Sequence, residues 1–270
     1  MGHQVGYSRS PMLHGYWLQT LQIEGAYELV DIGPDEFPDF FRNLRARGYA
    51  GGNITKPHKG AAFRLVDRRD AAAEAVGAVN CVWYEGTALV GGNTDVEGFL
   101  ANLDEQAPGW DAAHGLAVVI GAGGAAGAIV YALLGRGFRV AVVNRTVANA
   151  DALATRFDAR VSAHGFARLS GLLAAAALLI NASLLGATRQ PALEIDIAPL
   201  DRQAVVCDIV YVPLVTPLLE SARERGHRTA DGLGMLLHQA APAFARWFDI
   251  VPPVTADLRA LVEADIRRTS

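Results

Sequence analysis

The glycine-rich turn at residues 121–126 constrains the fold of this chain more than any other feature. A continuous apolar run, LAVVI (116–120), leads directly into Gly121-x-Gly123-x-x-Ala126, and a helical pattern follows as far as residue 137. Such a turn is common in isolation, but between a strand and a helix it is typical of a βαβ unit that holds a dinucleotide. The glycines let backbone N–H groups approach a pyrophosphate at the positive end of the helix. A tight turn without a ligand is the alternative interpretation.

The next apolar strand, FRVAVVNRT (138–146), indicates which dinucleotide is bound. Sites for NAD usually place an acidic residue near the end of this strand, where it holds the ribose 2′-OH. Here the strand ends in Asn144, Arg145 and Thr146, with no acid. An arginine pairs well with a 2′-phosphate, and a threonine hydroxyl adds a hydrogen bond. The pattern therefore favours NADP(H) over NAD(H), and a solvated arginine at a strand end is the alternative.

The rest of the chain also alternates strands with helices, which predicts an α/β fold of one large or two smaller domains. With 270 residues, 51% of them hydrophobic, the chain can bury a sizeable core. Helices are expected at 11–23 (behind Ser10 as a possible N-cap), 34–48, 57–67, 96–106, 233–248 and 254–268. Strands are expected at 26–32, 49–55, 177–181 and 204–210, and on both sides of a turn at Glu85-Gly86.

Composition argues against several classes of function. The net charge is −4 and no long basic run occurs, which disfavours nucleic acid or an anionic membrane as a partner. The two cysteines, Cys81 and Cys207, lie far apart, so we expect two buried thiols in a reducing cytoplasm rather than a disulfide or zinc site. The apolar run 169–185 is too short and Ala-rich for a membrane span, and the first residues lack the apolar core of a signal peptide. No cluster with metal-ligand spacing occurs, so no metal is expected.

Short polar clusters follow or precede the expected elements of the first hundred residues. They are Ser8-Arg9-Ser10, Asn53-Ile54-Thr55 with Lys59, Asn80, and Asn93-Thr94-Asp95. Ligands of open α/β sheets bind beyond the carboxyl ends of strands. Hydroxyls, amides, one amine and one carboxylate suit a small polyhydroxylated substrate. Helix capping by the serines and turn formation by the asparagines are the alternative roles.

The chain resembles the shikimate dehydrogenase family. The matching segments occur in the family's order and cover almost the whole chain. They are SRSPMLH (8–14), GGNITKPHK (51–59), GAVN (77–80), GGNTDVEGF (91–99), GAGGAAGA (121–128), NRT (144–146), DIVYVPLVTPLL (208–219) and DGLGMLLHQA (231–240). As a set, these segments are far more specific than any one of them.

The resemblance implies reversible, NADPH-dependent reduction of 3-dehydroshikimate to shikimate, in aromatic amino-acid biosynthesis. It implies a substrate-binding catalytic domain of residues 1–99, completed by C-terminal helices at 233–270, and a Rossmann-like NADP-binding domain of residues 100–232. The chain is expected to be cytoplasmic and to take a small-molecule substrate. Both a monomer and a homodimer remain open.

Residue by residue, the resemblance implies two sets of ligand-binding side chains. The expected catalytic pair is Lys59 and Asp95. Substrate would be bound by Ser8, Ser10, Asn53, Thr55, Asn80, Gln239 and Tyr211. The cofactor would be bound by Gly121, Gly123, Gly124, Ala125, Ala126, Asn144, Arg145, Thr146, Gly232 and Met235. Tyr211, Gly232 and Met235 would lie near the nicotinamide.

The chain departs from the family pattern in a few places. Lys56 stands where an apolar residue is common, and NASLLGA (181–187) differs from the usual segment beside the nicotinamide. Met1 stands where the family has an apolar residue of an earlier strand, so we expect the sheet to lack its first strand. Lys56 and Lys59 are the only lysines among 24 Lys and Arg residues. A general acid for a ketone must release a proton, which arginine does not do near neutral pH, so Lys59 is the expected proton donor.

Two other functions remain open from the sequence. Quinate, or both quinate and shikimate, could be the substrate, because members of this family share the same motifs. A protein that binds NADP without catalysis is the alternative of another class, and the intact pair of Lys59 and Asp95 disfavours it.

Overall fold

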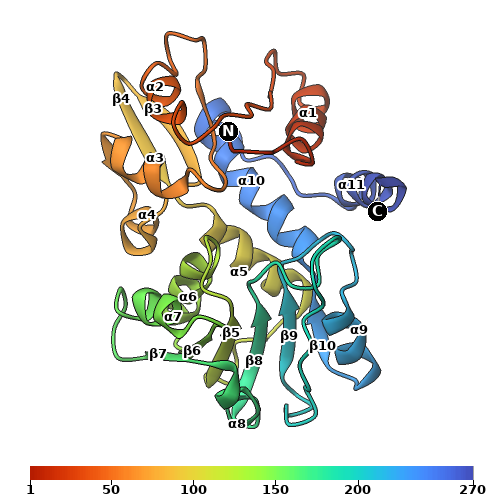
Figure 1. Ribbon diagram of the computed structural model, residues 1–270. Helices are drawn as coiled ribbons and strands as arrows, with labels where there is room; N and C mark the ends of the chain where they lie inside the picture. The colour runs from red at the N-terminus through yellow and green to blue at the C-terminus, as the bar shows by residue number, and fades with distance from the viewer. Residues whose placement is uncertain (270) are drawn as a thin grey trace. The chain divides into compact units, whose positions relative to one another are not determined.

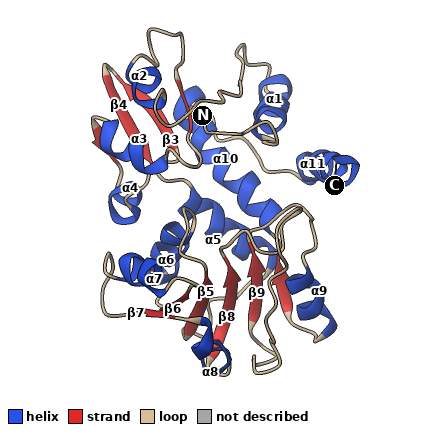
Figure 2. Ribbon diagram, in the orientation of Figure 1, coloured by secondary structure: helices blue, strands red, loops and turns tan. Residues whose placement is uncertain are grey.

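The computed structural model describes residues 1–269, which form two compact units (Figure 1). Unit 1 contains Met1–Asp95 and Leu237–Val262, and unit 2 contains Val96–Leu236 and the residues from Glu263 onward. Each unit has its own sheet (Figure 2). The chain passes from one unit to the other at three points, inside helices α5 (Asp95–Gln106), α10 (Gly232–Phe248) and α11 (Ala256–Thr269). The α/β class predicted from the sequence is confirmed.

Unit 1 is built on a four-stranded sheet in the order β1-β3-β4-β2. The strands are β1 (Gly51–Asn53), β2 (Arg68–Arg69), β3 (Cys81–Glu85) and β4 (Ala88–Gly92). Strands β3 and β4 form the expected hairpin, and Gly86 in its turn has a φ of +63°, which glycine adopts without strain. Strand β1 runs antiparallel to β3, and β2 runs parallel to β4.

Short helices cover the sheet of unit 1. They are α1 (Ser10–Thr20), α2 (Phe37–Arg42), α3 (Lys59–Leu65) and α4 (Ala71–Val76). Fully buried Phe37, Phe41 and Leu44 pack with Ile54 and Val82 in one core cluster. Burying side chains of this size stabilises the fold by about 1.5–3 kcal/mol each. Ser10 is not the N-cap of α1; Arg9 takes that position, and the Ser10 N–H donates to the Ser8 hydroxyl.

The strand expected at 26–32 is wrong. Its one ladder contact is an isolated parallel bridge between Gly2 and Asp31. Gly2 hydrogen-bonds to Val30 and Ile32 on one side, while Met1 and His3 bond to Thr55 and Lys56 on the other. Residues 1–3 therefore pair on both sides, although the pairing is too short to be a strand of the sheet. The helix expected at 34–48 is also shorter, and its last residues form turns that end at Gly48, whose φ is +89°.

Unit 2 is built on a six-stranded sheet in which every pair of neighbours is parallel. Its order is β10-β9-β8-β5-β6-β7, so the strands in sequence order run outward from β5 in both directions. The strands are β5 (Leu116–Ile120), β6 (Arg139–Val143), β7 (Val161–His164), β8 (Ala176–Asn181), β9 (Val205–Asp208) and β10 (Arg228–Ala230). The order reverses between β5 and β8, which is where dinucleotides bind in this architecture.

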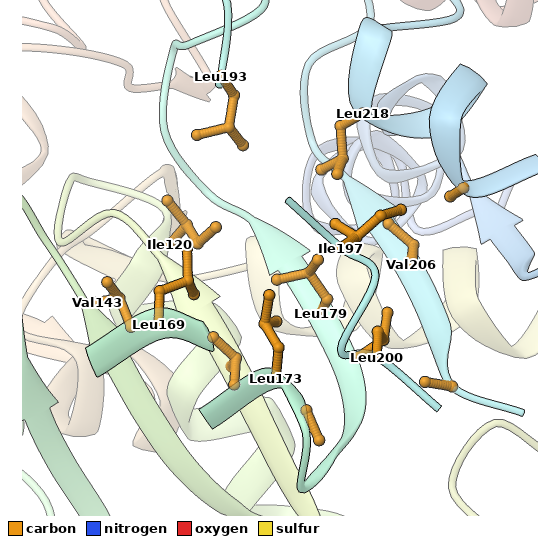
Figure 3. Close-up of a cluster of buried hydrophobic side chains, with 14 of the residues drawn as sticks. Ile120, Val143, Leu169, Leu173, Leu179, Leu193, Ile197, Leu200, Val206 and Leu218 are labelled. Carbon is orange, nitrogen blue, oxygen red and sulfur yellow. The ribbon is translucent and has the colours of Figure 1, made fainter. Parts of the chain in front are cut away.

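The central strands of unit 2 are continuous apolar runs because helices cover both faces of a parallel sheet. Ile120, Val143, Leu179 and Val206 are buried in one cluster, shown in Figure 3. The covering elements are α6 (Ala126–Gly135), α7 (Val147–Ala154), a 3-10 helix (Phe166–Arg168), α8 (Leu169–Leu173) and α9 (Pro217–Glu224). No helix among residues 1–269 is long and apolar enough to cross a membrane.

Candidate active site

Three strand ends meet at one edge of the sheet in unit 1. Asn53 ends β1 and lies opposite Cys81, which in turn lies opposite Gly92 at the end of β4. Antiparallel pairing therefore brings Asn53, Asn80 and the residues after Gly92 to the same edge. Three of the polar clusters, those that contain Asn53, Asn80 and Asn93, gather here because of this register, although they are far apart in sequence.

Lys59 and Asp95 form an ion pair at this edge. Each is the first residue of a helix, α3 and α5 respectively. Lys59 Nζ donates to Asp95 Oδ2 at 2.5 Å, and the two side chains are 18% and 10% exposed. The Lys59 carbonyl accepts from the Val79 N–H, which fixes the start of α3 beside the residues that lead into β3. Removing one partner of so buried a pair would leave the other charge uncompensated.

Asn80 holds the Asp95 carboxylate from the other side and is itself hydrogen-bonded to Thr94. Asn80 Nδ2 donates to Asp95 Oδ1 at 2.7 Å and to Thr94 Oγ1 at 3.1 Å. Asn80 Oδ1 accepts from the Thr94 N–H at 2.8 Å. Each oxygen of Asp95 therefore has its own donor, Asn80 for Oδ1 and Lys59 for Oδ2. Thr94 Oγ1 also donates to Gln239 Oε1 of α10 at 3.5 Å, which brings Gln239 into the group.

Asn53 and the two serines lie in the same unit. The phenol of Tyr27 donates to Asn53 Oδ1 at 2.9 Å, and Asn53 Nδ2 donates to the Asn80 carbonyl at 3.3 Å. Ser8 Oγ and Ser10 Oγ are 3.2 Å apart, and the Ser10 side chain interacts with the Tyr27 phenol. The hydroxyls and the amide are thus connected through Tyr27.

Among the expected substrate residues of unit 1, Thr55 is held through its backbone. Its N–H donates to the Met1 carbonyl and its carbonyl accepts from the His58 N–H. Within residues 1–269, no group of three His, Cys, Asp or Glu side chains could hold a metal ion. An ammonium, a carboxylate, amides and hydroxyls are the chemical groups that this edge offers.

The glycine-rich turn of unit 2 follows β5 at the point where the strand order reverses. Gly121 has a φ of +107°, and a Cβ there would lie 3.1 Å from the backbone of Ala182 and Ser183. Only glycine permits this approach to the end of β8 without strain. Gly123 and Gly124 are exposed, and α6 begins at Ala126 behind Ala125, whose side chain offers no cap. The turn leaves backbone N–H groups open to an anion at the helix start.

The end of β6 carries the residues expected to select the nucleotide. Asn144 Nδ2 donates to the Thr146 carbonyl at 2.9 Å, which shapes the loop. Arg145 is exposed, and no carboxylate within the described part of the chain forms an ion pair with it. Its guanidinium is therefore available to a phosphate. The donor set of turn and strand end fits a dinucleotide with a 2′-phosphate.

Gly232, Met235 and Tyr211 lie in unit 2, away in sequence from the glycine-rich turn. Gly232 begins α10, and a Cβ there would lie 2.3 Å from the Ile209 carbonyl oxygen, so the helix start packs directly on the segment that follows β9. Met235 is buried, and Tyr211 is partly buried in the same segment after β9.

A buried carboxylate also ties together the loops after β8 and β9. Asp208 Oδ1 accepts from Asn181 Nδ2 at 3.0 Å, and Oδ2 accepts from Thr216 Oγ1 at 2.7 Å. Burial raises the pKa of Asp208 from 3.8 to about 6, and its hydrogen bonds oppose the shift. Asn181 in turn accepts from Ser183, which shapes the segment at 181–187.

Sequence reasoning did not assign three of these residues to a site. Thr94 lies inside the polar cluster Asn93-Thr94-Asp95, but nothing in the sequence marks it as a substrate residue. Tyr27 lies in the segment expected to be a strand, and its contact with Asn53 is a tertiary pairing of residues 26 positions apart. Asp208 is part of a matched motif, but nothing in the sequence indicates that it is buried.

Three family models match the chain. They describe the shikimate dehydrogenase substrate binding domain at residues 1–82, shikimate / quinate 5-dehydrogenase at 105–210, and the shikimate 5'-dehydrogenase C-terminal domain at 232–262. Shikimate dehydrogenase (NADP(+)) from Mesorhizobium japonicum is 54% identical over 98% of this chain and 95% of its own. The same enzyme from Methylocella silvestris is 53% identical over 99% of this chain and 96% of its own.

Solved structures show the same relationship. Shikimate 5-dehydrogenase from Thermus thermophilus, in complex with NADP(H) and shikimate, has a TM-score of 0.86 at 34% identity, covering 100% of this chain and 97% of that one. Quinate dehydrogenase from Corynebacterium glutamicum, in complex with NAD, has a TM-score of 0.88 at 29% identity, covering 97% and 96%. The chain belongs to the shikimate dehydrogenase family.

Proposed function

We propose that this protein catalyses the reversible, NADPH-dependent reduction of 3-dehydroshikimate to shikimate. Relatives that are more than 50% identical over nearly the whole chain carry this activity in their names. The observation that carries the proposal is the buried ion pair of Lys59 with Asp95, held by Asn80 at an edge lined with hydroxyls and amides. A protein that only binds NADP would not need this pair.

The substrate, in this proposal, binds to the part of the chain that comprises residues 1–99 and the C-terminal helices at 233–270. Ser8, Ser10, Asn53, Thr55, Asn80 and Gln239 would hold its hydroxyl and carboxylate groups, and Tyr211 is a further proposed substrate residue. Support comes from the hydrogen bonds that connect Asn53, Asn80 and Gln239 to the neighbourhood of Asp95. These donors and acceptors suit a polyhydroxylated ring.

Lys59 is the proposed general acid and base. Bound NADPH supplies the hydride to the ketone carbon. Lys59 stabilises the negative charge that develops on the ketone oxygen and gives that oxygen a proton, and the reverse reaction takes the proton back. Asp95 orients the ammonium through the 2.5 Å contact. Lys59 and Asn80 each use only one lone pair of the Asp95 carboxylate. The remaining lone pairs can accept a hydrogen bond from a substrate hydroxyl.

The proposed cofactor part is the Rossmann-like region at 100–232. Gly121, Gly123, Gly124, Ala125 and Ala126 would hold the pyrophosphate, and Asn144, Arg145 and Thr146 would hold the adenosine 2′-phosphate. Gly232 and Met235 would border the nicotinamide. The exposed, unpaired guanidinium of Arg145 and the absence of an acid beside it in the sequence support NADP(H).

Quinate is the second candidate substrate, because a quinate dehydrogenase is among the structural neighbours. Initial rates with shikimate and with quinate, each with NADP⁺ and with NAD⁺, separate the candidates. We expect shikimate with NADP⁺ to give the highest kcat/KM. A higher value with quinate would change the substrate, and NADPH binding without any turnover would favour the non-catalytic alternative. We also propose a cytoplasmic location, which the buried thiols of Cys81 and Cys207, neither of them in a disulfide, support.

A further inference from the structure

The phenol of Tyr27 lies among residues proposed to bind the substrate, although no motif points to it. Its hydroxyl donates to Asn53 Oδ1 at 2.9 Å and interacts with the Ser10 side chain. Asn53 and Ser10 come from different elements, the end of β1 and the start of α1. Tyr27 therefore connects two proposed substrate residues that come from separate elements.

The orientation of the Asn53 amide follows from two of its neighbours, the Asn80 carbonyl and the Tyr27 phenol. The Asn80 carbonyl oxygen can only accept, and it already accepts from the Ile54 N–H at 2.7 Å. It lies 3.3 Å from Asn53 Nδ2, so the NH₂ end of the amide must face it. The oxygen end then faces Tyr27, and the phenol must act as the donor. The NH₂ group keeps a second N–H beyond the one that it gives to Asn80.

The ring of Tyr27 is held in place by aromatic packing. It stacks on His14 with centroids 4.2 Å apart and an interplanar angle of 9°, and it contacts Trp247 at 5.9 Å. Burial lowers the pKa of His14 to about 3, so the stacked imidazole is neutral. Burial also raises the pKa of the Tyr27 phenol, and the Cys81 thiol beside it acts in the same direction. The hydroxyl therefore stays protonated and remains a donor at any working pH.

We propose that Tyr27 is a positioning residue for substrate binding, which fixes Asn53 so that the amide presents an N–H, rather than its carbonyl oxygen, to an oxygen of the substrate. The inference rests on the proposed function, because it takes Asn53 to be a substrate ligand. The substrate class that this arrangement selects carries an acceptor oxygen, hydroxyl or carboxylate, opposite Asn53. Tyr27 acts through Asn53 and does not itself need to touch the substrate.

Tyr27→Phe removes the hydroxyl alone and keeps the stacked ring. We expect KM for shikimate to rise roughly fivefold to tenfold, the usual effect of losing one hydrogen bond in a binding site. We expect kcat to change less than threefold and KM for NADP⁺ to stay unchanged. Tyr49→Phe is the matched control, because its hydroxyl also donates to a side chain, Glu28, but on the exposed surface. That variant should leave both KM values unchanged.

A double-mutant cycle with Asn53→Ala separates positioning from general support of the fold. If Tyr27 acts through Asn53, Tyr27→Phe adds less than twofold to KM once Asn53 is already Ala. Full additivity of the two effects, or an unchanged KM in Tyr27→Phe, would overturn the proposal. Asn53→Asp gives a second measurement should Tyr27→Phe not fold. It keeps an acceptor for Tyr27 but has no N–H, so shikimate binding should weaken at least tenfold, and an unchanged Kd would refute the inference.

Measurements on the wild-type protein distinguish failure of the proposed function from failure of the inference about Tyr27. Wild-type protein that shows neither turnover nor calorimetric binding of shikimate would refute the function, and the inference about Tyr27 with it. Wild-type protein that turns over shikimate while Tyr27→Phe matches it in KM would refute only the inference.

Discussion

Lys59 illustrates how one residue type can be required in a chain that otherwise uses arginine. The chain has only two lysines, Lys56 and Lys59, among 24 Lys and Arg residues. An arginine at position 59 could pair with Asp95 at least as well, because its planar guanidinium matches a carboxylate. It could not release a proton near neutral pH. The lysine is therefore explained by proton exchange rather than by charge.

The first prediction concerns Lys59→Ala and Lys59→Arg. Both should lower kcat at least tenfold and up to about 10⁴-fold, the range of general acid–base catalysis, while KM for shikimate changes only a fewfold. Steady-state rates of NADP⁺ reduction measure both constants. Circular dichroism checks that each variant is folded, because Asp95 loses its buried partner in the Ala variant. A loss of less than tenfold in either variant would exclude Lys59 as the proton donor.

Lys56 has a different environment from Lys59, although the two are three residues apart. Lys56 is exposed, whereas Lys59 is mostly covered. Water screens the charge of an exposed ammonium strongly. Lys56→Ile should therefore leave the pH profile of kcat unchanged, with the same midpoints at 0.1 M salt. A shift of the profile, larger at low salt than at high salt, would show that Lys56 acts on Lys59 as a like charge.

At the scale of elements, the Asp208 network joins two loops at the carboxyl ends of β8 and β9. Asn181 ends β8 and Asp208 ends β9, and the two strands lie side by side at Asn181 and Asp208. Thr216, the N-cap of α9, supplies the third partner. A carboxylate at this position satisfies donors from three segments at once, which an apolar residue could not do. Ionisation of a buried carboxylate has a cost in stability, however, and this cost can be measured.

Asp208→Asn tests this cost through the pH dependence of unfolding. The folded-state pKa of Asp208 is raised to about 6, above its ordinary 3.8. Its ionisation therefore disfavours the folded state, and the penalty grows as pH rises from about 4 to about 6. The full shift corresponds to roughly 3 kcal/mol. The Asn variant removes the charge. Its amide oxygen can keep accepting from Asn181 and Val210, while its NH₂ group would donate to Thr216 Oγ1 in place of accepting from it.

We expect the stability of Asp208→Asn relative to wild type to increase by about 1–3 kcal/mol between pH 4 and pH 7, measured by urea unfolding. Asp201→Asn is the control, because Asp201 is exposed and its carboxylate accepts only from the Gln203 N–H in a turn. The stability of Asp201→Asn relative to wild type should show no such increase. A constant difference for Asp208→Asn across the pH range would show that the group is not a titrating charge in the fold.

The elements that the sequence predicts well are those with a long, unbroken pattern. Strand β5 occupies 116–120 as expected, because a buried parallel strand is a continuous apolar run between clear turn signals. Strands β2 and β10 have two and three residues and carry arginine, so local sequence does not reveal them. Segment 26–32 has the composition of a strand, yet within residues 1–269 its backbone-to-backbone hydrogen bonds go only to Gly2. Pairing partners are a tertiary property that no local pattern contains.

The candidate site also contains some residues that the sequence predicts and others that it does not. Lys59, Asp95 and Asn80 are predicted from the polar clusters that contain them and from the resemblance to the family, and the structure joins them by hydrogen bonds. Tyr27 is not predicted, because its role depends on the contact with Asn53, and the two residues are brought together only by the fold. Residues that act on the substrate leave a sequence signal, while residues that position them depend on the fold.

At the scale of the whole molecule, the two sets of proposed ligand residues lie in different units, except that Tyr211 of the substrate set belongs to unit 2. Lys59, Asp95 and their hydrogen-bond partners belong to unit 1, while Gly121 and Arg145 belong to unit 2. Each set is built on strand ends of its own sheet. Either ligand should therefore bind without the other, and a change in one set should leave binding at the other intact.

Thermal unfolding with each ligand alone tests this separation. A ligand at about 100 times its Kd adds about 2.7 kcal/mol of stability to the unit that binds it. For a unit of this size the midpoint should rise by roughly 5–10 °C. We expect NADP⁺ to produce this rise without shikimate, in wild type and in Lys59→Ala alike. Arg145→Ala should lose most of the rise with NADP⁺, because the 2′-phosphate loses its cation, but keep the full rise with shikimate. If NADP⁺ no longer raised the midpoint of Lys59→Ala, cofactor binding would depend on the residues of unit 1. If NADP⁺ raised the midpoint of Arg145→Ala as much as that of wild type, Arg145 would not belong to the cofactor site.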